Sequence, residues 1–427
     1  MTRHQRLATL TCLSLSLSIS ATAQEPGSEE ALVAWAEETA IPLSLDAPVP
    51  ADVLRPLLSD ARIVFLGEPD HYIHEKYAFR VRFLQGLHEL GWRHLGMEMG
   101  RSDGIRFDEY LGGADERRLL DIGLYSSMGD ISRAISSGGF FAMEFVYARH
   151  VRELAPVDER YHYFGFDLDM SPGNGLEDAY RRAMAHGAED LTAVLHEIWK
   201  GEDPVLGLED VIEELKDDES PFHEGLTPEI RSQVLLDLTT LVASRHFRKT
   251  DVFGEDEPAN LAGAFARREE QMFELFDAYI GSLGKEERIA LTGHNMHLGR
   301  GWRDTTWKEL ETDIPIQLWP TIGAHITKNH GDEVFAIWLV YDHGVHAAAE
   351  TQAQREVGSV PETFEHLLAR LPHESFLLPL RSDDPRSSWL DEKRTFRVNG
   401  GVAHGRLREL TDAVFFVREV RAPGKEL

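Results

Sequence analysis

Cysteine is almost absent from this chain of 427 residues, whose single cysteine is Cys12. A chain with one cysteine forms no internal disulfide and offers no thiolate cluster for a zinc site. Cys12 also lies within residues 1–23, where Arg3 and Arg6, an apolar stretch and a small-residue A-x-A ending have the pattern of a cleaved export signal. We therefore expect a cysteine-free mature protein that is periplasmic or secreted and has no cysteine nucleophile.

Basic residues are few, and long apolar runs are missing. The chain carries 44 Lys and Arg against 73 Asp and Glu, a formal net charge of −29. A surface of this sign repels nucleic acid and anionic membranes. After residue 23, no run approaches the roughly 20 apolar residues that a membrane-spanning helix needs. We expect a small-molecule ligand, no nucleic-acid partner and no membrane span, while the oligomeric state stays open.

Internal repeats and low-complexity linkers are also missing, which favours one domain. Residues 24–60 are predicted to be a lead-in segment with one short helix, and residues 61–427 to be an α/β domain. Within it, residues 171–285 hold acidic amphipathic patterns without a strand, which predicts a helical insertion covering the pocket. The fold class that we expect is therefore α/β, an open and mostly parallel sheet flanked by helices.

Short apolar runs mark the expected strands of this sheet. They lie at 63–68, 94–99, 161–167 and 288–293, with further runs at 314–322, 334–341, 375–380 and 413–419. Helical patterns at 72–90, 103–111 and 140–155 separate the first strands. Alternation of this kind is typical of parallel strands joined by helices.

The first four runs each end on a carboxylate or an imidazole. Their terminal polar residues are Glu68, Glu98, Asp167 and His294. Two H-x-x-H motifs extend this pattern, because His71 and His74 follow the first run and His294 and His297 follow the fourth. Ligands of parallel sheets bind at the carboxyl ends of the strands. We therefore expect these side chains to form one acid–base site.

The turn Gly67-Glu68-Pro69-Asp70-His71 is the candidate catalytic segment. A carboxylate beside an imidazole orients the ring and raises its basicity, so that it can activate water. The alternative is structural: Glu68 or Asp70 caps the following helix. In the same way, His74 can lie on the outer helix face, and Glu75 and Arg80 can form a solvated ion pair.

A metal site is a second interpretation of the same residues. If a divalent metal is present, its expected ligands are His71, Glu68, Glu98 and His294, since imidazole and carboxylate suit zinc, manganese and iron. The sequence has no H-E-x-x-H motif and no cysteine cluster, so we expect no cofactor.

A serine mechanism is a third interpretation. Gly100-Arg101-Ser102-Asp103-Gly104 matches G-x-S-x-G directly after a predicted strand, and Ser102, Asp167 and His294 follow the order of a hydrolase triad. No H-G-G-G-like oxyanion segment is present, and the mechanism leaves Glu68, His71 and Glu98 without a role. We expect Ser102 instead to cap the next helix.

Several of these motifs, taken together, resemble the erythromycin esterase family. They are Gly67-Glu68-x-x-His71 with Glu75 and Arg80, Gly96-Met97-Glu98, Phe164-Gly165-Phe166-Asp167, Arg268-Glu269-x-x-Met272-x-Glu274, Gly293-His294-Asn295-x-His297 and Asp412-Ala413-Val414-Phe415-Phe416. The resemblance runs from about residue 60 to 420. It implies hydrolysis of a carboxylic ester or lactone by water, without a covalent acyl-enzyme.

Roles for individual residues follow from this resemblance. It implies that His71 is the general base, that Glu68 and Glu98 orient it or the water, and that Arg80 and His294 bind the reacting carbonyl with His297 beside them. Tyr72, Glu75, Asp167 and Arg268 are expected to bind substrate or to support these groups. Pro69, Asp70 and Tyr72 stand where the family often has small residues, which leaves the chemistry intact and the substrate, macrolide or other, open.

Two further hypotheses remain. One is a metal-dependent hydrolase acting on peptides or phosphate esters. The other is a non-catalytic periplasmic protein that binds a ligand such as haem.

Overall fold

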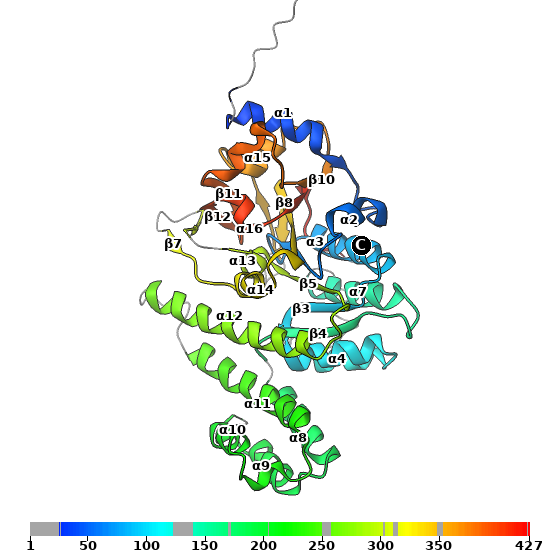
Figure 1. Ribbon diagram of the computed structural model, residues 1–427, viewed down its shortest axis with the longest axis vertical. Coiled ribbons are helices and arrows are strands. Elements are labelled where there is room, and N and C mark those ends of the chain that lie inside the picture. The colour runs from blue at the N-terminus through cyan, green and yellow to red at the C-terminus, as the bar shows by residue number, and fades with distance from the viewer. Residues whose placement is uncertain are drawn as a thin grey trace, which may run out of the picture.

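A computed structural model describes most of the chain after the predicted export signal (Figure 1). The described residues are 25, 27–122, 140–169, 172–203, 205–249, 258–301, 304–310, 315–347, 353–424 and 426–427. The predicted signal at 1–23 and Cys12 lie outside them. Among the described residues, no helix is long and apolar enough to cross a membrane.

The centre of the molecule is a large mixed sheet. Its path runs β1 (Ile41–Pro42), β10 (Ser375–Pro379), β13 (Ala413–Val420), β8 (Val334–Ala347), β2 (Ile63–Glu68), β5 (Ile289–His294), β3 (His94–Gly100) and β4 (His162–Asp167), and β9 (Gln354–Val357) pairs with β8. The neighbours from β13 to β4 are all parallel, whereas β1, β10 and β9 pair antiparallel. The prediction of an open, mostly parallel α/β sheet is confirmed.

Strand β2 shows why the strand runs are continuously apolar. Val64 and Leu66 pack into a core with α3 (Glu75–Glu89) and α7 (Phe140–Glu153). Ile63 and Phe65 point the other way, into a core with α12 (Pro258–Gly281) and α14 (Ile322–His330). A strand that is covered on both faces needs apolar side chains at every position.

The remaining short elements surround this sheet. They are α1 (Glu29–Thr39), α2 (Ala51–Leu57), α4 (Arg101–Leu111), α13 (Asn295–Leu298), α15 (Phe364–Leu368), α16 (Leu407–Leu410) and the 3-10 helices η1 (Glu116–Asp121), η2 (Pro221–His223), η3 (Gly331–Glu333) and η4 (Pro385–Asp391). The lead-in thus holds two helices, not one, and its β1 joins the sheet edge beside β10.

A second sheet was not predicted. Its four antiparallel strands run in the order β11 (Arg394–Val398), β12 (Gly401–Gly405), β6 (Thr306–Glu309) and β7 (Ile316–Gln317). The strand expected over 314–322 is reduced to the two residues of β7, because Leu318 and Trp319 turn into the core and Thr321 caps α14. The Asn399-Gly400 turn between β11 and β12 was a missed hairpin signal: both residues have positive φ, at 51° and 65°.

Within its described residues, the segment 171–285 consists of helices joined by short loops and contains no strand, as the amphipathic patterns indicate. It contains α8 (Pro172–Ala185), α9 (Glu189–Lys200), α10 (Leu208–Lys216), α11 (Pro228–Lys249) and α12. Helices α8 to α11 share a core of their own and extend away from the sheet, whereas α12 packs against it (Figure 1). That this segment is an insertion within a single domain stays a prediction.

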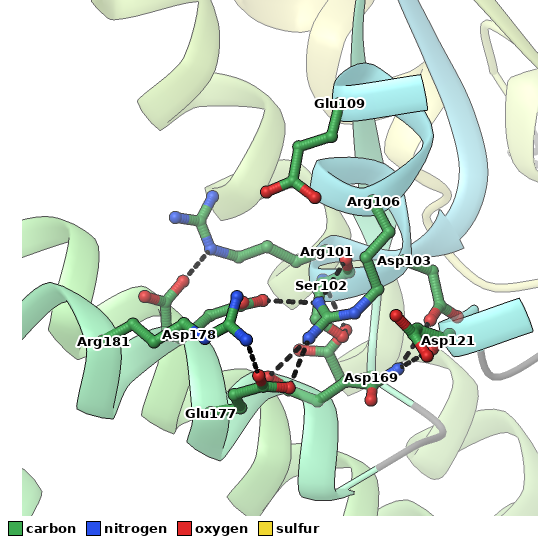
Figure 2. A network of polar contacts seen from close by, with 12 residues as sticks. Arg101, Ser102, Asp103, Arg106, Glu109, Asp121, Asp169, Glu177, Asp178 and Arg181 are labelled. Atoms are coloured by element: carbon green, nitrogen blue, oxygen red, sulfur yellow. Dashed lines mark hydrogen bonds and ion pairs between the residues drawn. The ribbon is translucent and has the colours of Figure 1, made fainter. Parts of the chain in front are cut away.

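A buried polar network joins the helical segment to the sheet (Figure 2). Its centre is Asp169, just beyond β4, which accepts hydrogen bonds from the Ser102 backbone N–H and hydroxyl, both at 2.7 Å, and from the Thr240 hydroxyl of α11 at 3.0 Å. Arg106 of α4 pairs with Asp178 of α8 at 2.8 Å. Burial and the nearby Asp103 carboxylate raise the pKa of Asp169 to about 7, against the hydrogen bonds from Ser102 and Thr240.

This raised pKa predicts a pH-dependent stability. Because the folded Asp169 binds its proton more tightly than the unfolded one, the free energy of unfolding falls as the pH rises from about 4 to 7. Asp169→Asn keeps the neutral form at every pH, so its stability relative to wild type should increase by about 2 kcal/mol between pH 5 and pH 8. Urea unfolding at both pH values measures this. The exposed Asp190→Asn on α9 is the matched control, and a difference that does not change with pH contradicts the assignment.

Candidate active site

Glu68 and His71 form the pair that the sequence predicted. Glu68 is the last residue of β2 and is fully buried, and its Oε1 lies 2.7 Å from Nδ1 of His71. Arg80 forms an ion pair with Glu68, and the Lys76 Nζ lies 3.6 Å from its Oε1. Burial alone would raise the pKa of Glu68, but Arg80, Lys76 and His71 hold it well below its usual range. Glu68 is therefore a charged acceptor for the imidazole.

The turn after β2 gives this pair its geometry. The backbone at Gly67 runs so close to α13 that a Cβ there would lie 2.3 Å from the Asn295 Oδ1. Helix α3 begins only at Glu75, and its N-cap residue His74 makes no capping side-chain bond. Asp70 accepts the Tyr72 N–H at 3.3 Å and pairs with His346 at 3.2 Å. The capping interpretation is wrong for Glu68 and for Asp70.

The His71 side chain is 35% exposed, in contrast to its fully buried partner. Since Nδ1 faces Glu68, the tautomer that this contact favours carries its proton on Nδ1 and leaves the Nε2 lone pair available. Within the described part of the chain, no hydrogen bond involves Nε2. The Tyr72 ring stands edge-on to the imidazole, with 6.1 Å between ring centroids.

Glu98 is the centre of a second cluster of polar contacts, next to the Glu68–His71 pair. Its Oε2 accepts the backbone N–H of His294 at 2.8 Å, and its Oε1 lies 3.2 Å from the His297 Nε2 and 3.5 Å from an Arg268 nitrogen. Burial would raise the pKa of Glu98, but His297, His71 and Arg268 hold it well below its usual range. Like Glu68, Glu98 is a carboxylate that stays ionised, and its side chain is only 10% exposed.

His297 lies between two carboxylates. Its Nδ1 is 2.5 Å from Glu269 of α12, and its Nε2 faces Glu98. Burial would lower the pKa of His297, but Glu269 and Glu98 raise it to about 10, so the ring is an imidazolium at neutral pH. Glu269 is in turn fixed by the Ile322 backbone N–H, at 2.8 Å. Our sequence reasoning gave Glu269 no role, although it follows Arg268 in a family-like motif.

His294 differs from His297 in its contacts and in its charge. Its Nε2 donates to the Pro69 carbonyl at 3.0 Å, and its Nδ1 accepts the Met296 N–H at 3.1 Å. Burial and the neighbouring His71 and His297 lower its pKa to about 3, against the pull of Glu98, so the ring is neutral. With both nitrogens bonded to the backbone, this geometry does not support the expectation that His294 binds a reacting carbonyl. Its ring stands 5.0 Å from that of His71 and supports it.

The tip of the β11–β12 hairpin also contacts the catalytic turn. The Asn399 backbone N–H donates to the Pro69 carbonyl at 2.8 Å, so this oxygen accepts from both Asn399 and His294. The second sheet thus fixes the segment that carries His71. Sequence patterning could reveal the Asn-Gly turn but not its contact with the site.

Arg80 and Glu75 lie elsewhere than expected. Arg80 is 2% exposed and points inward, with its guanidinium 5.6 Å from the centre of the Tyr147 ring. Arg80 therefore contacts Glu68 from the protein interior and does not face a substrate. Glu75 pairs with Arg421 at 2.9 Å and anchors the C-terminal segment. The interpretation of Glu75 and Arg80 as a solvated ion pair is wrong, because both residues are buried and have different partners.

Arg268 and Asp167 form a close pair at the end of β4. The Arg268 Nε donates to Asp167 Oδ1 at 2.9 Å, and the guanidinium also reaches Glu98. Asp167 therefore positions the Arg268 guanidinium beside Glu98 and His297.

The serine interpretation is not supported by the geometry. Ser102 is 2% exposed, and its hydroxyl donates to Asp169 (Figure 2). Asp167 pairs with Arg268, and both nitrogens of His294 are occupied, so the three residues form no triad. Ser102 does not cap α4 either, because Asp169 accepts its backbone N–H and takes that role.

Three of the four expected metal ligands are already engaged by other groups. Glu68 is engaged by Arg80 and Lys76, Glu98 by His297 and Arg268, and His294 by two backbone groups. In the described ranges, no group of three or more His, Cys, Asp or Glu side chains has the geometry to hold a metal.

The imidazolium of His297 predicts a measurable change in stability. Its folded pKa of about 10 lies above the unfolded value of about 6.5, so its contribution is complete below pH 6.5 and is lost as the pH approaches 10. His297→Gln leaves Glu98 and Glu269 without their shared cation and should cost about 3–5 kcal/mol near pH 6. Urea unfolding near pH 6 and pH 9.5 should show a smaller cost at the higher pH. The exposed His404→Gln provides the control, and equal costs at both pH values would contradict a charged His297.

The chain matches the erythromycin esterase family over residues 88–420. The match includes Glu98, Asp167, Arg268, His294 and His297, while Glu68 and His71 precede it. No curated protein matches the chain.

Solved structures share the fold at low sequence identity. A Bacillus cereus protein is 16% identical with a TM-score of 0.71, over 94% of this chain and 99% of that one. A succinoglycan biosynthesis protein is 17% identical with a TM-score of 0.67, over 93% and 99%. A mutant of the erythromycin esterase EreC in its open conformation is 15% identical with a TM-score of 0.64, over 88% and 94%. The family match spans most of the chain and includes the Glu98, Arg268 and His297 cluster, and the chain belongs to the erythromycin esterase family, which implies a hydrolase acting on ester bonds.

Proposed function

We propose that this protein is an exported hydrolase that cleaves a carboxylic ester or lactone with water activated by His71, without a covalent intermediate. The Glu68–His71 contact at 2.7 Å is the observation that carries the proposal. It joins a buried, ionised carboxylate to a part-exposed imidazole, which is the arrangement that a general base needs.

In the first step, the His71 Nε2 takes a proton from water while the resulting hydroxide attacks the substrate carbonyl carbon. Glu68 stabilises the imidazolium that forms, because its charge faces Nδ1. Arg80 and Lys76 keep Glu68 ionised throughout. General-base catalysis of this kind contributes about 10²–10⁴-fold in rate.

The attack turns the carbonyl oxygen into an oxyanion, which needs positive charge nearby. Arg268 supplies it in this proposal, together with the nearby charge of the His297 imidazolium, in place of Arg80, which points inward, and of His294, which is neutral. When the tetrahedral intermediate collapses, the His71 imidazolium returns its proton to the departing alkoxide. The products are a carboxylic acid and an alcohol, or one hydroxy acid from a lactone.

Water is the proposed nucleophile because Ser102, the candidate nucleophilic side chain, is bonded to another residue. The Ser102 hydroxyl is buried and bonded to Asp169, and the single cysteine lies in the predicted signal. Export is proposed from that signal, whose basic start, apolar stretch and small-residue ending are typical of secreted proteins. Macrolides belong to the proposed substrate class of lactones.

Removal of the base tests the mechanism. His71→Ala should reduce kcat for a chromogenic ester by about 10²-fold or more, since no other described imidazole beside Glu68 can replace it. His404→Ala, on the exposed face of β12, should keep wild-type activity. Intact-mass measurement during turnover should find only the unmodified chain. Activity of a folded His71→Ala protein within threefold of wild type would refute the assignment, and an added acyl mass would refute direct attack by water.

Chelation separates this proposal from a metal-dependent hydrolase. Because the carboxylates and imidazoles of the site are engaged by cations and backbone groups, extended dialysis against EDTA should leave ester hydrolysis largely unchanged. Rates are compared before dialysis, after it, and after addition of zinc or manganese. Activity that is lost on chelation and restored by either metal would favour the metal-dependent alternative.

A further inference from the structure

Strand β8 extends well beyond its neighbour β2 and passes beside the turn that carries His71. β8 has 14 residues and β2 has six, and their parallel pairing ends at Gly67 and Trp338. Residues 339–347 of β8 therefore lie past the end of β2. The last of them, Ala347, donates its backbone N–H to the Tyr72 carbonyl at 3.0 Å. This extension of β8 thus contacts the turn directly.

The side chain of His346 is a second link between the extension and the turn. Its Nδ1 lies 3.2 Å from the Asp70 Oδ2, and its Nε2 lies 2.7 Å from the Tyr341 hydroxyl. All three side chains are buried. The other oxygen of Asp70 accepts the Tyr72 N–H at 3.3 Å. Because a buried carboxylate needs donors or cations within reach, His346 stabilises Asp70 in this position, directly before His71.

The charges around His346 favour one arrangement of its protons. Burial lowers the pKa of His346, against the pull of Asp70, and Arg397 and Arg355 lower it further, so the ring is neutral at neutral pH. Burial and Asp70 raise the pKa of Tyr341, against Arg397, so the phenol keeps its proton. The Nδ1 proton then faces Asp70, and the Tyr341 hydroxyl donates to Nε2.

The residues next to His71 are fixed by contacts with distant segments, whereas His71 itself is not. The Pro69 carbonyl accepts the Asn399 N–H at 2.8 Å, and the Tyr72 carbonyl is bonded to β8. Among the described residues, no hydrogen bond involves the His71 backbone. The orientation of the His71 ring therefore depends on its contact with Glu68 and on how its neighbours in the turn are held.

We propose that His346 is a positioning residue for the general base, which acts through Asp70 to hold His71 against Glu68. The proposal rests on the proposed function and adds a residue to it. Because His346 contacts neither substrate nor the reacting atoms, its loss should lower kcat and leave KM nearly unchanged. A displacement of about 1 Å at a catalytic group can reduce the rate by about 10²-fold.

Substitution of His346 tests this role in the hydrolysis of p-nitrophenyl acetate. His346→Leu removes both contacts and should lower kcat at least tenfold, with KM within threefold of wild type. His346→Gln offers an amide N–H to Asp70 and a carbonyl oxygen to Tyr341, so its kcat should return to within threefold of wild type. Tyr341→Phe removes one hydrogen bond and keeps the ring that packs against Arg397, so its loss should be smaller than that of His346→Leu.

His343→Leu, on the same strand, is the matched control. The His343 Nδ1 also faces a carboxylate, 2.9 Å from the Asp342 Oδ2, but its side chain is 39% exposed and contacts no described residue of the turn. Its kcat and KM should equal those of wild type.

Urea unfolding shows whether each variant is folded. A kcat within twofold of wild type in folded His346→Leu, or equal losses in folded His346→Leu and His346→Gln, would overturn the positioning role. If His346→Leu does not fold, Tyr341→Phe decides: a kcat twofold to tenfold below wild type supports the role, and an unchanged kcat overturns it.

A spectroscopic measurement needs no ester hydrolysis. In protein labelled with ¹⁵N-histidine, the ring N–H signal that disappears in His71→Ala reports the contact of His71 with Glu68. This signal should shift or broaden in His346→Leu and stay unchanged in His343→Leu. If this holds while wild type cleaves no ester, the positioning role stands and the hydrolase proposal fails. If esters are cleaved in a His71-dependent way while His346→Leu alters neither kcat nor the signal, the positioning role fails and the hydrolase proposal stands.

Discussion

Two carboxylates, one buried and one nearly buried, at the ends of parallel strands constrain the rest of this structure. A charge without a partner is costly to bury, so each carboxylate needs cations or donors within reach. Glu68 contacts the buried Arg80 and Lys76 and the part-exposed His71. Glu98 has His297, Arg268 and the His294 backbone N–H. These contacts fix the turns after β2 and β5 and the position of α12.

The surroundings of His297 and His294 give these two neighbouring imidazoles opposite protonation states. His297 is charged because two carboxylates face it, whereas His294 is neutral because burial and the neighbouring imidazoles lower its pKa. His71 has a carboxylate on one nitrogen and partial exposure on its side chain. Residue type alone does not distinguish these rings, since each role depends on what the two nitrogens contact.

The helical segment contributes to this site through α12 and through the network around Asp169. Helix α12 supplies Arg268, which contacts Glu98, and Glu269, which contacts His297. Asp169 joins α4 to α11, and Arg106 joins α4 to α8. These contacts hold helices α8 and α11 against the segment that follows β3 and β4.

The sequence by itself determined the parallel sheet and the residues at its edge, because apolar runs buried on both faces must end where polar side chains can meet. It therefore predicted the positions of Glu68, Glu98, Asp167 and His294. Only the tertiary structure decided their partners. Arg80 lies behind Glu68, Glu269 pairs with His297, and Pro69 accepts from Asn399, since these contacts join segments far apart in the chain and depend on how helices and the second sheet pack. Local patterning carries no information about such packing angles.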